Sequence, residues 1–449
     1  MKDHEIFKAY DIRGVYPERI NKEFAFLLGR AAVAFASAKT VLVGADARIS
    51  SPELKQSLIE GIIDGGAEAI DIGLASTPLF NFSVLTDKKV DLGIMVTASH
   101  NPKEWNGFKF LDKNGEPIGL EHGLNKIKHL MAEAEFEQKE KGAVKELNFQ
   151  KEYLDKILSL IDIEKIKPFK VVIDTANAVG GLLIDQIMDR LPCRVEYLFK
   201  ELDGNFPNHE ANPLKKETLV ALVAKVKESG ADLGVAFDGD ADRVGFVDDQ
   251  GNILSGDIAT ALLAEKVLTK HPGGKVIYDL RSGWAVKEAV LKAGGQPVMF
   301  KVGRTLIIKE MARQKAVFAG ELSSHFYYRD FFNVESADLT MLYMLELLSE
   351  KNEKLSKMVR AVDVYFRSGE LNFEVNDQDG VMNNLKSKYA AGAKDVSQMD
   401  GIRIEFDDWW FNVRASNTES VLRLNLEAKT KEMMEAKTTE ISALIKHET

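Results

Sequence analysis

The chain has 449 residues, too many for one ordinary hydrophobic core, and its globular composition, 45% hydrophobic and 29% charged, predicts about two to four domains. Its 69 acidic residues outnumber its 59 basic ones, and the net charge of -10 argues against nucleic acid or an anionic membrane as the main partner. The N-terminal segment is polar and no apolar run approaches a membrane span, so we expect a cytoplasmic protein with no membrane partner.

Short apolar strands alternate with amphipathic helices over most of the chain, which predicts α/β layering. In the first round we expect a helix at 51–63, a charged helical stretch at about 119–141, and strands at 40–43, 68–72 and 91–97. The second round has strands at 169–174, 193–198 and 231–237. The single cysteine, Cys193, reads as a strand or core residue and excludes an intramolecular disulfide and a cysteine metal cluster.

A hairpin signal at 249–251 precedes a third round of similar length. Its expected helices lie at 257–268, 283–293, 306–314 and 338–350, and its strands at 275–279, 297–301 and 316–319. The tail differs, with expected strands at 362–366, 401–406, 409–413 and 420–427 and helices at 381–389 and 430–447. We therefore expect three tandem related α/β domains and a C-terminal α+β domain, at 1–147, 148–250, 251–364 and 365–449.

The most informative segment is Ala-Phe-Asp-Gly-Asp-Ala-Asp-Arg at 236–243, which ends an apolar run. It places carboxylates at alternate positions, Asp238, Asp240 and Asp242, directly before Arg243. Three like charges so near one another repel unless a cation neutralises them. Ligands that are all oxygen suit a hard divalent ion such as Mg²⁺. An EF-hand is excluded, because its glutamate position holds Asp249 and its glycine position holds the arginine. The segment predicts a metal site.

A second segment, Thr-Ala-Ser-His-Asn-Pro at 97–102, puts the hydroxyl of Ser99 in a turn-like loop after another apolar run. The segment lacks the Gly-x-Ser-x-Gly elbow of a hydrolase. On spacing alone, a serine that only caps or turns the chain is an equal alternative. Taken with the aspartate loop, the segment suggests a serine that carries phosphate and a metal that helps to move it.

Three further places carry groups suited to a sugar phosphate. Glu321 and Ser323 follow a predicted strand and could clamp neighbouring sugar hydroxyls, although for this loop alone a helix cap by Ser323 or Ser324 is the commoner structure. Residues 414–418 offer a guanidinium, hydroxyls and an amide as a phosphate cradle, or form an ordinary polar hairpin. Arg13 and Lys109 each offer one cation beside the loops of the first domain, and either alone would be a surface charge.

In this order the motifs resemble those of the α-D-phosphohexomutase family, most closely its phosphomannomutase/phosphoglucomutase branch. The resemblance extends over nearly the whole chain and rests on the segments at 10–14, 97–102, 205–213, 238–243, 320–325 and 414–418. It implies four domains with mixed sheets around a central cleft. It also implies an isomerase that interconverts hexose 6-phosphate and hexose 1-phosphate, of mannose and/or glucose. The phosphate would pass through an enzyme phosphoserine and a hexose 1,6-bisphosphate, which also serves as activator.

Carried over by motif, the resemblance implies a phosphoserine at Ser99 and one Mg²⁺ held by the serine phosphate and the three aspartates. It implies catalytic roles for Ser99, Lys109, His325, Arg13 and Arg243, and substrate binding by Tyr10, Arg281, Glu321, Ser323, Arg414, Ser416, Asn417 and Thr418. Lys109 and His325 are the candidates for moving the hydroxyl proton, and the division between them stays open. The residue types suit a reaction that depends on in-line placement and charge neutralisation.

The chain departs from the branch in three places. Ser324 stands where glycine is usual, Ser420 where proline is usual, and Arg281 where a lysine or another cation often lies. The catalytic set is intact, but the sugar stays open. The alternatives are an amino sugar phosphate mutase of the glucosamine type, against which Asn417 argues, a non-catalytic sugar-phosphate-binding protein, and a Mg²⁺-dependent phosphatase. The oligomeric state is not predicted.

Overall fold

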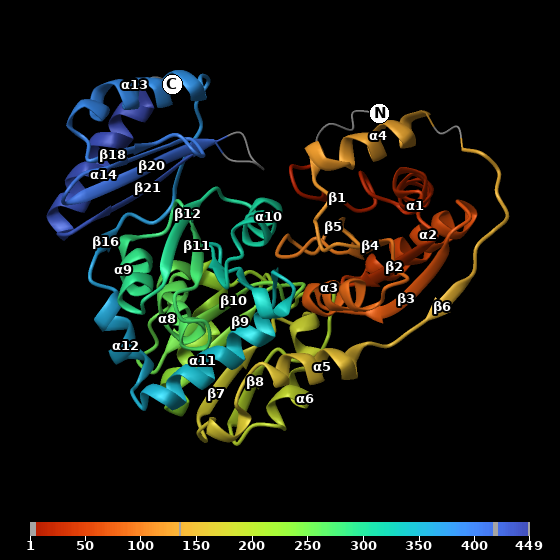
Figure 1. Cartoon of the computed structure of the whole chain (residues 1–449), viewed down its shortest axis with the longest axis horizontal. Coiled ribbons are helices and arrows are strands. Elements are labelled where there is room, and N and C mark those ends of the chain that lie inside the picture. Colours follow the sequence, from red (N-terminus) through yellow and green to blue (C-terminus); the bar gives the residue numbers. More distant parts are fainter. Residues whose placement is uncertain (1–5, 134–135, 416–420, 448–449) are drawn as a thin grey trace.

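The computed structural model describes residues 6–133, 136–415 and 421–447. Four domains, each with its own sheet, follow one another along an arc from the N-terminal to the C-terminal part of the chain (Figure 1). Their order confirms the expected architecture of three α/β domains and a different C-terminal domain. In these three described stretches, no helix is both long and apolar enough to cross a membrane.

The first domain has a mixed sheet of six strands in the order β1-β5-β4-β2-β3-β6, in which β1 and β5 are antiparallel to their neighbours. The central strand β4 reads Leu-Gly-Ile-Met-Val and is buried throughout, as expected of a strand covered on both faces. The strands are β1 (Ile12–Val15), β2 (Thr40–Ala45), β3 (Glu68–Leu74), β4 (Leu92–Val96), β5 (Trp105–Asp112) and β6 (Val144–Glu146). The helices are α1 (Lys22–Ala36), α2 (Ser51–Asp64), α3 (Thr77–Thr86) and α4 (Leu124–Glu133).

Side-chain caps explain where two of these helices begin. The side chain of Asn21 accepts a hydrogen bond from the amide of Phe24 at the start of α1. Ser76 does the same for the amide of Leu79 at the start of α3, where a proline also occupies the first turn. Such caps satisfy amides that have no partner inside the helix.

The second and third domains repeat the mixed α/β pattern. The second has the strand order β10-β9-β7-β8 with only β10 antiparallel, and the third has β12-β11-β13-β14-β15, in which β14 and β15 run antiparallel. The second-domain elements are α5 (Gln150–Ser159), β7 (Lys170–Asp174), α6 (Ile184–Met188), β8 (Arg194–Leu198), α7 (Val220–Ser229), β9 (Leu233–Phe237) and β10 (Val244–Asp248). The third-domain elements are α8 (Gly256–Lys270), β11 (Lys275–Asp279), α9 (Trp284–Lys292), β12 (Gln296–Phe300), α10 (Arg304–Gln314), β13 (Phe318–Gly320), β14 (Phe326–Tyr328), β15 (Val334–Glu335), α11 (Ala337–Lys351) and α12 (Leu355–Val362).

The fourth domain is an antiparallel sheet with helices, as expected of an α+β unit. Its strand order is β16-β21-β20-β19-β18, and β17 also pairs with β21. The elements are β16 (Phe366–Arg367), β17 (Leu371–Phe373), α13 (Gln378–Tyr389), β18 (Asp395–Ser397), β19 (Ile402–Glu405), β20 (Trp409–Ala415), β21 (Leu422–Ala428) and α14 (Lys431–His447).

The hydrophobic cores are divided unevenly among the domains. One continuous apolar cluster includes Leu42 of the first domain, Val171 of the second and Val276 of the third. The fourth domain packs around a cluster of its own, which includes Phe411 and Ile441. The first three domains are therefore joined by shared apolar packing, whereas the fourth keeps a separate core.

The structure corrects three expectations about local structure. Within the charged stretch expected to be helical at 119–141, helix covers Leu120–His122 and α4, and residues 136–141 form no helix but run toward β6, which pairs with β3. The strand expected at 362–366 is wrong for 362–365, since α12 ends at Val362 and β16 starts at Phe366. Val362 and Tyr365 pack against the core whereas Val364 and Phe366 are exposed, so the apolar residues do not share one sheet face. The strands β1 and β5 were not expected; they pair so that Arg13 lies opposite Gly107.

Candidate active site

Ser99 lies just beyond the buried central strand β4, in the loop where its motif predicts it. Its backbone is left-handed, with φ of 51°, and its amide donates to Thr97 Oγ1 at 2.9 Å. Its hydroxyl donates to Asp238 Oδ2 at 2.9 Å and lies 3.3 Å from His100 Nδ1. The serine loop and the aspartate loop, 139 residues apart in sequence, are thus in direct contact.

The aspartate loop joins the antiparallel strands β9 and β10. Asp238, Asp240 and Asp242 are all buried, and one oxygen from each lies within 4.8 Å of the others. Asp238 Oδ1 accepts hydrogen bonds from the amides of Asp242 and Arg243, which curls the loop around that carboxylate. A side chain at Gly239 would place its Cβ 2.2 Å from the carbonyl oxygen of Ser99, so the two loops meet this closely only with glycine there.

Lys109 extends from β5 into this cluster of carboxylates. Its Nζ lies 2.5 Å from Asp240 Oδ2 and 2.6 Å from Asp242 Oδ2. The other oxygen of each of these two side chains, Oδ1, is buried and accepts no hydrogen bond from the residues that the structure describes. Three buried carboxylates with two such oxygens fit a hard cation, because buried anionic oxygens need a partner.

The charges of the cluster are not equivalent. Burial, together with the charges of Asp242 and Asp240, raises the pKa of Asp238 well above its usual range. Burial also acts to raise the pKa of Asp242, but Lys109, His325 and Arg243 outweigh it and hold that pKa well below its usual range. Near neutral pH, Asp242 is therefore more firmly ionised than Asp238.

The loop of the third domain at 320–325 packs directly on the aspartate loop. Arg243 and His325 form an isolated antiparallel bridge, and Arg243 Nε donates to His325 Nε2 at 3.1 Å. Burial and Arg243 lower the pKa of His325, but carboxylates 3.4 Å away on Asp242 and 3.3 Å away on Glu321 leave it above its usual value. Ser323 Oγ lies 3.0 Å from His325 Nδ1. The imidazole is therefore held between the two loops.

Glu321 and Tyr10 meet at the start of α10. Glu321 Oε1 accepts the amide of Gly303 at 3.1 Å, and Tyr10 Oη donates to the carbonyl of Val302 at 3.2 Å. Burial acts to raise the pKa of Glu321, but hydrogen bonds and charges, above all those of His325, lower it to about 2. A carboxylate that stays ionised can accept hydrogen bonds from sugar hydroxyls at any ordinary pH.

Arg13 reaches the serine loop from β1. Its Nη1 donates to the carbonyl of Ala98 at 3.1 Å and to the side chain of Asn101, while Nε pairs with Asp11 at 2.8 Å. Coulombic attraction from Asp240 and Asp242 also acts on this guanidinium. The structure thus gathers Ser99 and the three aspartates with a set of charged groups from three domains: Arg13, Lys109, Arg243 and His325.

Of the two remaining predicted cations, Arg281 lies at the border of the fourth domain and Arg414 lies within it. Arg281 is held by Asp279 at 2.8 Å and lies 3.5 Å from Glu370. Arg414, near the end of β20, lies 3.4 Å from Asp400, and its Nε donates no hydrogen bond to any residue described here. Ser416, Asn417 and Thr418, predicted to hold phosphate, lie outside the described residues.

Three residues at the site carry no motif that sequence reasoning recognised. Arg48 donates to the carbonyl of Ser99 at 2.6 Å. Thr77 Oγ1, at the start of α3, donates to Asp240 Oδ2 at 2.6 Å. Arg304, at the start of α10, pairs with Glu335 at 2.5 Å and interacts electrostatically with Asp242. Thr77 and Arg304 are the first residues of α3 and α10, but no helix was expected at 77 and the helix expected at 306–314 begins after Arg304, so no sequence pattern pointed to either residue.

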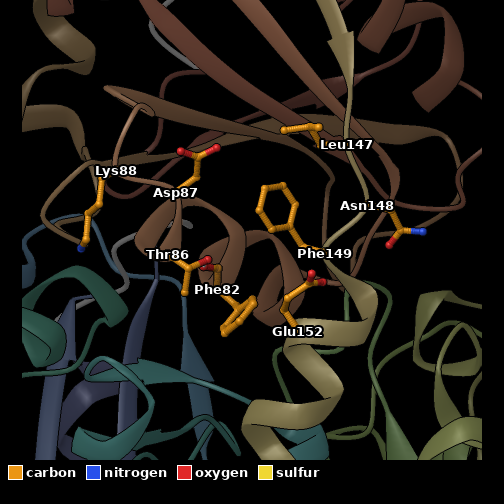
Figure 2. A pocket seen from close by; sticks show the side chains of 8 residues that line it. All are labelled: Phe82, Thr86, Asp87, Lys88, Leu147, Asn148, Phe149 and Glu152. Carbon is orange, nitrogen blue, oxygen red and sulfur yellow. The ribbon is translucent and has the colours of Figure 1, made fainter.

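A surface hollow lies away from this cluster, where α3 and α5 meet beside the connection from the first to the second domain (Figure 2). It is lined by Phe82, Thr86, Asp87, Lys88, Leu147, Asn148, Phe149 and Glu152. None of the predicted site residues lines it, so we do not assign it to the active site.

Four domains described for phosphoglucomutase/phosphomannomutase match the chain in order. The alpha/beta/alpha domains I, II and III match residues 4–138, 151–251 and 255–365, and the C-terminal domain matches 370–443. The chain belongs to this family. Its sequence is 40% identical to a phosphomannomutase of Vibrio cholerae and 38% identical to one of Methanocaldococcus jannaschii, over 99% of this chain in both cases and over 99% and 98% of those proteins.

A solved structure of the same family agrees with the fold. The crystal structure of a phosphoglucomutase/phosphomannomutase family protein from Burkholderia thailandensis matches with a TM-score of 0.91 and 32% identity, covering 99% of this chain and 97% of that one. Family membership confirms the resemblance that the motifs indicated, and with it the four-domain α/β fold class.

Proposed function

We propose that this protein is a Mg²⁺-dependent phosphohexomutase that interconverts hexose 6-phosphate and hexose 1-phosphate through a phosphoserine at Ser99. The observation that carries the proposal is the contact of the Ser99 hydroxyl with Asp238, within a cluster of three buried carboxylates that also pairs with Lys109. A nucleophile, a carboxylate cluster suited to a cation and a buried ammonium are the parts that phosphoryl transfer needs. Family membership gives the reaction class, an intramolecular phosphotransfer on a hexose phosphate.

In the first half-reaction, the phosphoryl group leaves Ser99 Oγ and bonds to the free hydroxyl oxygen of the substrate, whose proton passes to a nearby base, while Ser99 Oγ takes up a proton. The product is a hexose 1,6-bisphosphate. After it turns end for end, its other phosphoryl group returns to Ser99 Oγ, which gives up its proton, and the sugar oxygen takes up a proton. Lys109 and His325 are the candidates for taking up and giving back the hydroxyl proton, and both lie at the aspartate loop.

Asp238, Asp240 and Asp242 would hold one Mg²⁺ together with an oxygen of the serine phosphate. When bound, the ion neutralises the crowded anions and polarises the transferring phosphoryl group. Arg13 donates to the carbonyl of Ala98 in the serine loop, and the amide of Arg243 donates to Asp238 in the aspartate loop. Both guanidinium groups are therefore placed to offset the charge that moves between serine and sugar.

The substrate would bind between these loops and the fourth domain. Glu321 and Ser323 would accept and donate hydrogen bonds at the sugar hydroxyls, with Tyr10 beside them and Arg281 at the border of the fourth domain. Arg414 would grip the phosphate that does not react, together with Ser416, Asn417 and Thr418. The buried and incompletely paired guanidinium of Arg414 supports this role.

The preferred sugar is mannose and/or glucose in this proposal, and hexose 1,6-bisphosphate is also the activator. Phosphomannomutase is the name of the relatives that are 40% and 38% identical. An amino sugar phosphate is the alternative substrate. We also propose that the domains extend over 1–147, 148–250, 251–364 and 365–449, and that the protein acts in the cytoplasm.

A coupled assay with each hexose 1-phosphate, with and without a trace of the matching bisphosphate, tests the function. We expect turnover with mannose 1-phosphate or glucose 1-phosphate, stimulated by the bisphosphate and abolished by Ser99→Ala. Intact-mass analysis of the active enzyme should find one phosphate, and peptide mapping should place it on Ser99. Phosphate on another residue, or full activity of Ser99→Ala, would contradict the mechanism. Binding of hexose phosphates without turnover would instead favour a sugar-phosphate-binding protein.

A further inference from the structure

Arg48 lies between β2 and α2 and is buried, with 1% of its surface exposed. Nη1 donates to the carbonyls of Pro102 at 2.7 Å and Trp105 at 3.0 Å, and Nη2 to those of Ser99 at 2.6 Å and Asn101 at 2.7 Å. Nε donates to Asp46 Oδ2 at 3.1 Å, so all five N–H groups of the guanidinium have an acceptor.

Four of these acceptors are backbone carbonyls of a single loop, the one that carries Ser99. They lie at Ser99 itself and at three positions after it, so one side chain determines the course of the loop up to the start of β5. The loop needs such support, because Ser99 has a left-handed backbone that non-glycine residues adopt only when their surroundings hold them. A lysine offers three donors on one atom and could not reach four carbonyls and a carboxylate in this fork geometry.

A residue of the second domain covers this guanidinium. The ring of Phe206 lies 5.1 Å from the Arg48 guanidinium carbon and is itself almost completely buried. Two residues before it, a side chain at Gly204 would place its Cβ 2.3 Å from the carbonyl oxygen of Ala47, so the two domains meet here backbone to backbone. Phe206 belongs to the motif at 205–213, which has no part in the proposed chemistry.

We propose that Arg48 and Phe206 are positioning residues for phosphoryl transfer: Arg48 holds the Ser99 loop in its reactive geometry, and Phe206 makes that geometry depend on the docking of the second domain. The second domain also carries the aspartate loop. One interface thus places both the serine and the carboxylates that it must face. This inference rests on the proposed role of Ser99 as the residue that carries phosphate.

The test compares Arg48→Lys and Phe206→Leu with a matched control, Arg30→Lys. Arg30 belongs to the same domain, pairs with Asp64 at 3.2 Å and lies over the ring of Phe136 at 4.7 Å, but donates to no part of the Ser99 loop. Three quantities are measured in each variant: kcat and KM for the hexose 1-phosphate, the single-turnover rate of transfer from phosphorylated Ser99, and hydrogen exchange of the amides at 97–105.

For Arg48→Lys we expect kcat and the single-turnover rate to fall by about 100-fold, the loss typical of a reacting group displaced by about 1 Å. KM should change by less than about threefold, because the groups proposed to bind the sugar and its distal phosphate are untouched. Exchange at 97–105 should become faster, and the melting temperature should fall below that of Arg30→Lys, because buried carbonyls of the loop lose their donor. Phe206→Leu, which keeps apolar bulk but removes the ring face, should show the same pattern with a smaller loss.

Wild-type transfer rates and wild-type exchange at 97–105 in both variants would overturn the inference, as would a loss that appears only in KM. If Arg48→Lys does not unfold cooperatively and so is not properly folded, the same three measurements on Phe206→Leu decide whether the inference holds. Failure of the proposed function looks different: the wild-type enzyme then carries no phosphate on Ser99. Phosphate on Ser99 with unaltered variant kinetics would remove this inference alone.

Discussion

Replacing Lys109 by methionine tests how charge is balanced at the aspartate loop. The ammonium lies 2.5 Å from Asp240 and 2.6 Å from Asp242, and all three side chains are buried. Two unit charges about 4 Å apart attract by about 4 kcal/mol at an effective dielectric constant of about 20, and removing one partner of a buried pair costs about 3–5 kcal/mol. We therefore expect Lys109→Met to lower the free energy of unfolding of the metal-free protein by about 3–5 kcal/mol.

The same substitution should tighten Mg²⁺ binding, by about tenfold or more, because the ammonium sits on the Oδ2 atoms of two carboxylates whose Oδ1 atoms suit the metal, and the two cations repel each other. Lys109 is also one of the charges that hold the pKa of Asp242 low. A lowered carboxylate pKa contributes stability above the pKa of the unfolded state, about 3.9, and this contribution is lost as the pH falls through the folded pKa. The difference between wild type and variant should therefore be largest near neutral pH and shrink toward acid pH.

The assay is urea denaturation of dephosphorylated protein in EDTA at several pH values, with calorimetric titration of Mg²⁺ in parallel. Lys109→Arg is the control, because it keeps the charge. We expect turnover to fall strongly in Lys109→Met even though the metal binds more tightly. Equal unfolding free energies for Lys109→Met and wild type, combined with equal or weaker Mg²⁺ affinity, would show that this ammonium does not neutralise the loop.

Three further substitutions probe separate parts of the structure. Thr77→Val should weaken Mg²⁺ binding by about 10–100-fold by releasing Asp240, with Thr77→Ser close to wild type in the same titration. Arg414→Ala should raise KM for the hexose phosphate strongly and leave phosphorylation of Ser99 unchanged. Small-angle scattering should show that substrate compacts the wild type more than the variant. Equal compaction of the two proteins, with an unchanged KM, would mean that the phosphate binds elsewhere. Burial raises the pKa of Asp338 to about 6, so folding favours its protonated form, and the free energy of unfolding falls by about 2–3 kcal/mol as the pH rises from about 4 through 6. The variant Asp338→Asn should therefore melt at a higher temperature than wild type at about pH 8 and lose that advantage at about pH 4. An unchanged difference between the two pH values would contradict that reasoning.

Short-range patterns predicted the fold well where apolar runs are long. The strands around β4 and β9 were expected within a few residues, because a continuous apolar run predicts a strand covered on both faces. The strands β1 and β5 were overlooked, since polar residues that serve the site interrupt their apolar pattern. The opposite error lies at 362–365, where alternating apolar residues predicted a strand but the strand begins only at Phe366.

At the site, the sequence pointed to the side chains that the structure brings together but not to the groups that hold them. Spacing and residue type pointed to Ser99 and the aspartates, since carboxylates at alternate positions need a cation wherever they lie. Arg48 and Thr77 act on a carbonyl and on a carboxylate that come from distant parts of the chain. An isolated arginine or threonine has no local pattern that predicts such contacts, so only the folded structure could reveal them.

The contact between Gly239 and the carbonyl of Ser99 has a consequence for the newly made chain. Ser99 leaves the ribosome 139 residues before its partner Asp238, which at about 5–20 residues per second is a delay of roughly 7–28 s. During that interval the first domain can fold, but its serine faces no carboxylate cluster. Under the proposed mechanism, the growing chain is therefore inert toward sugar phosphates, and it becomes competent only late in synthesis, when the second domain docks.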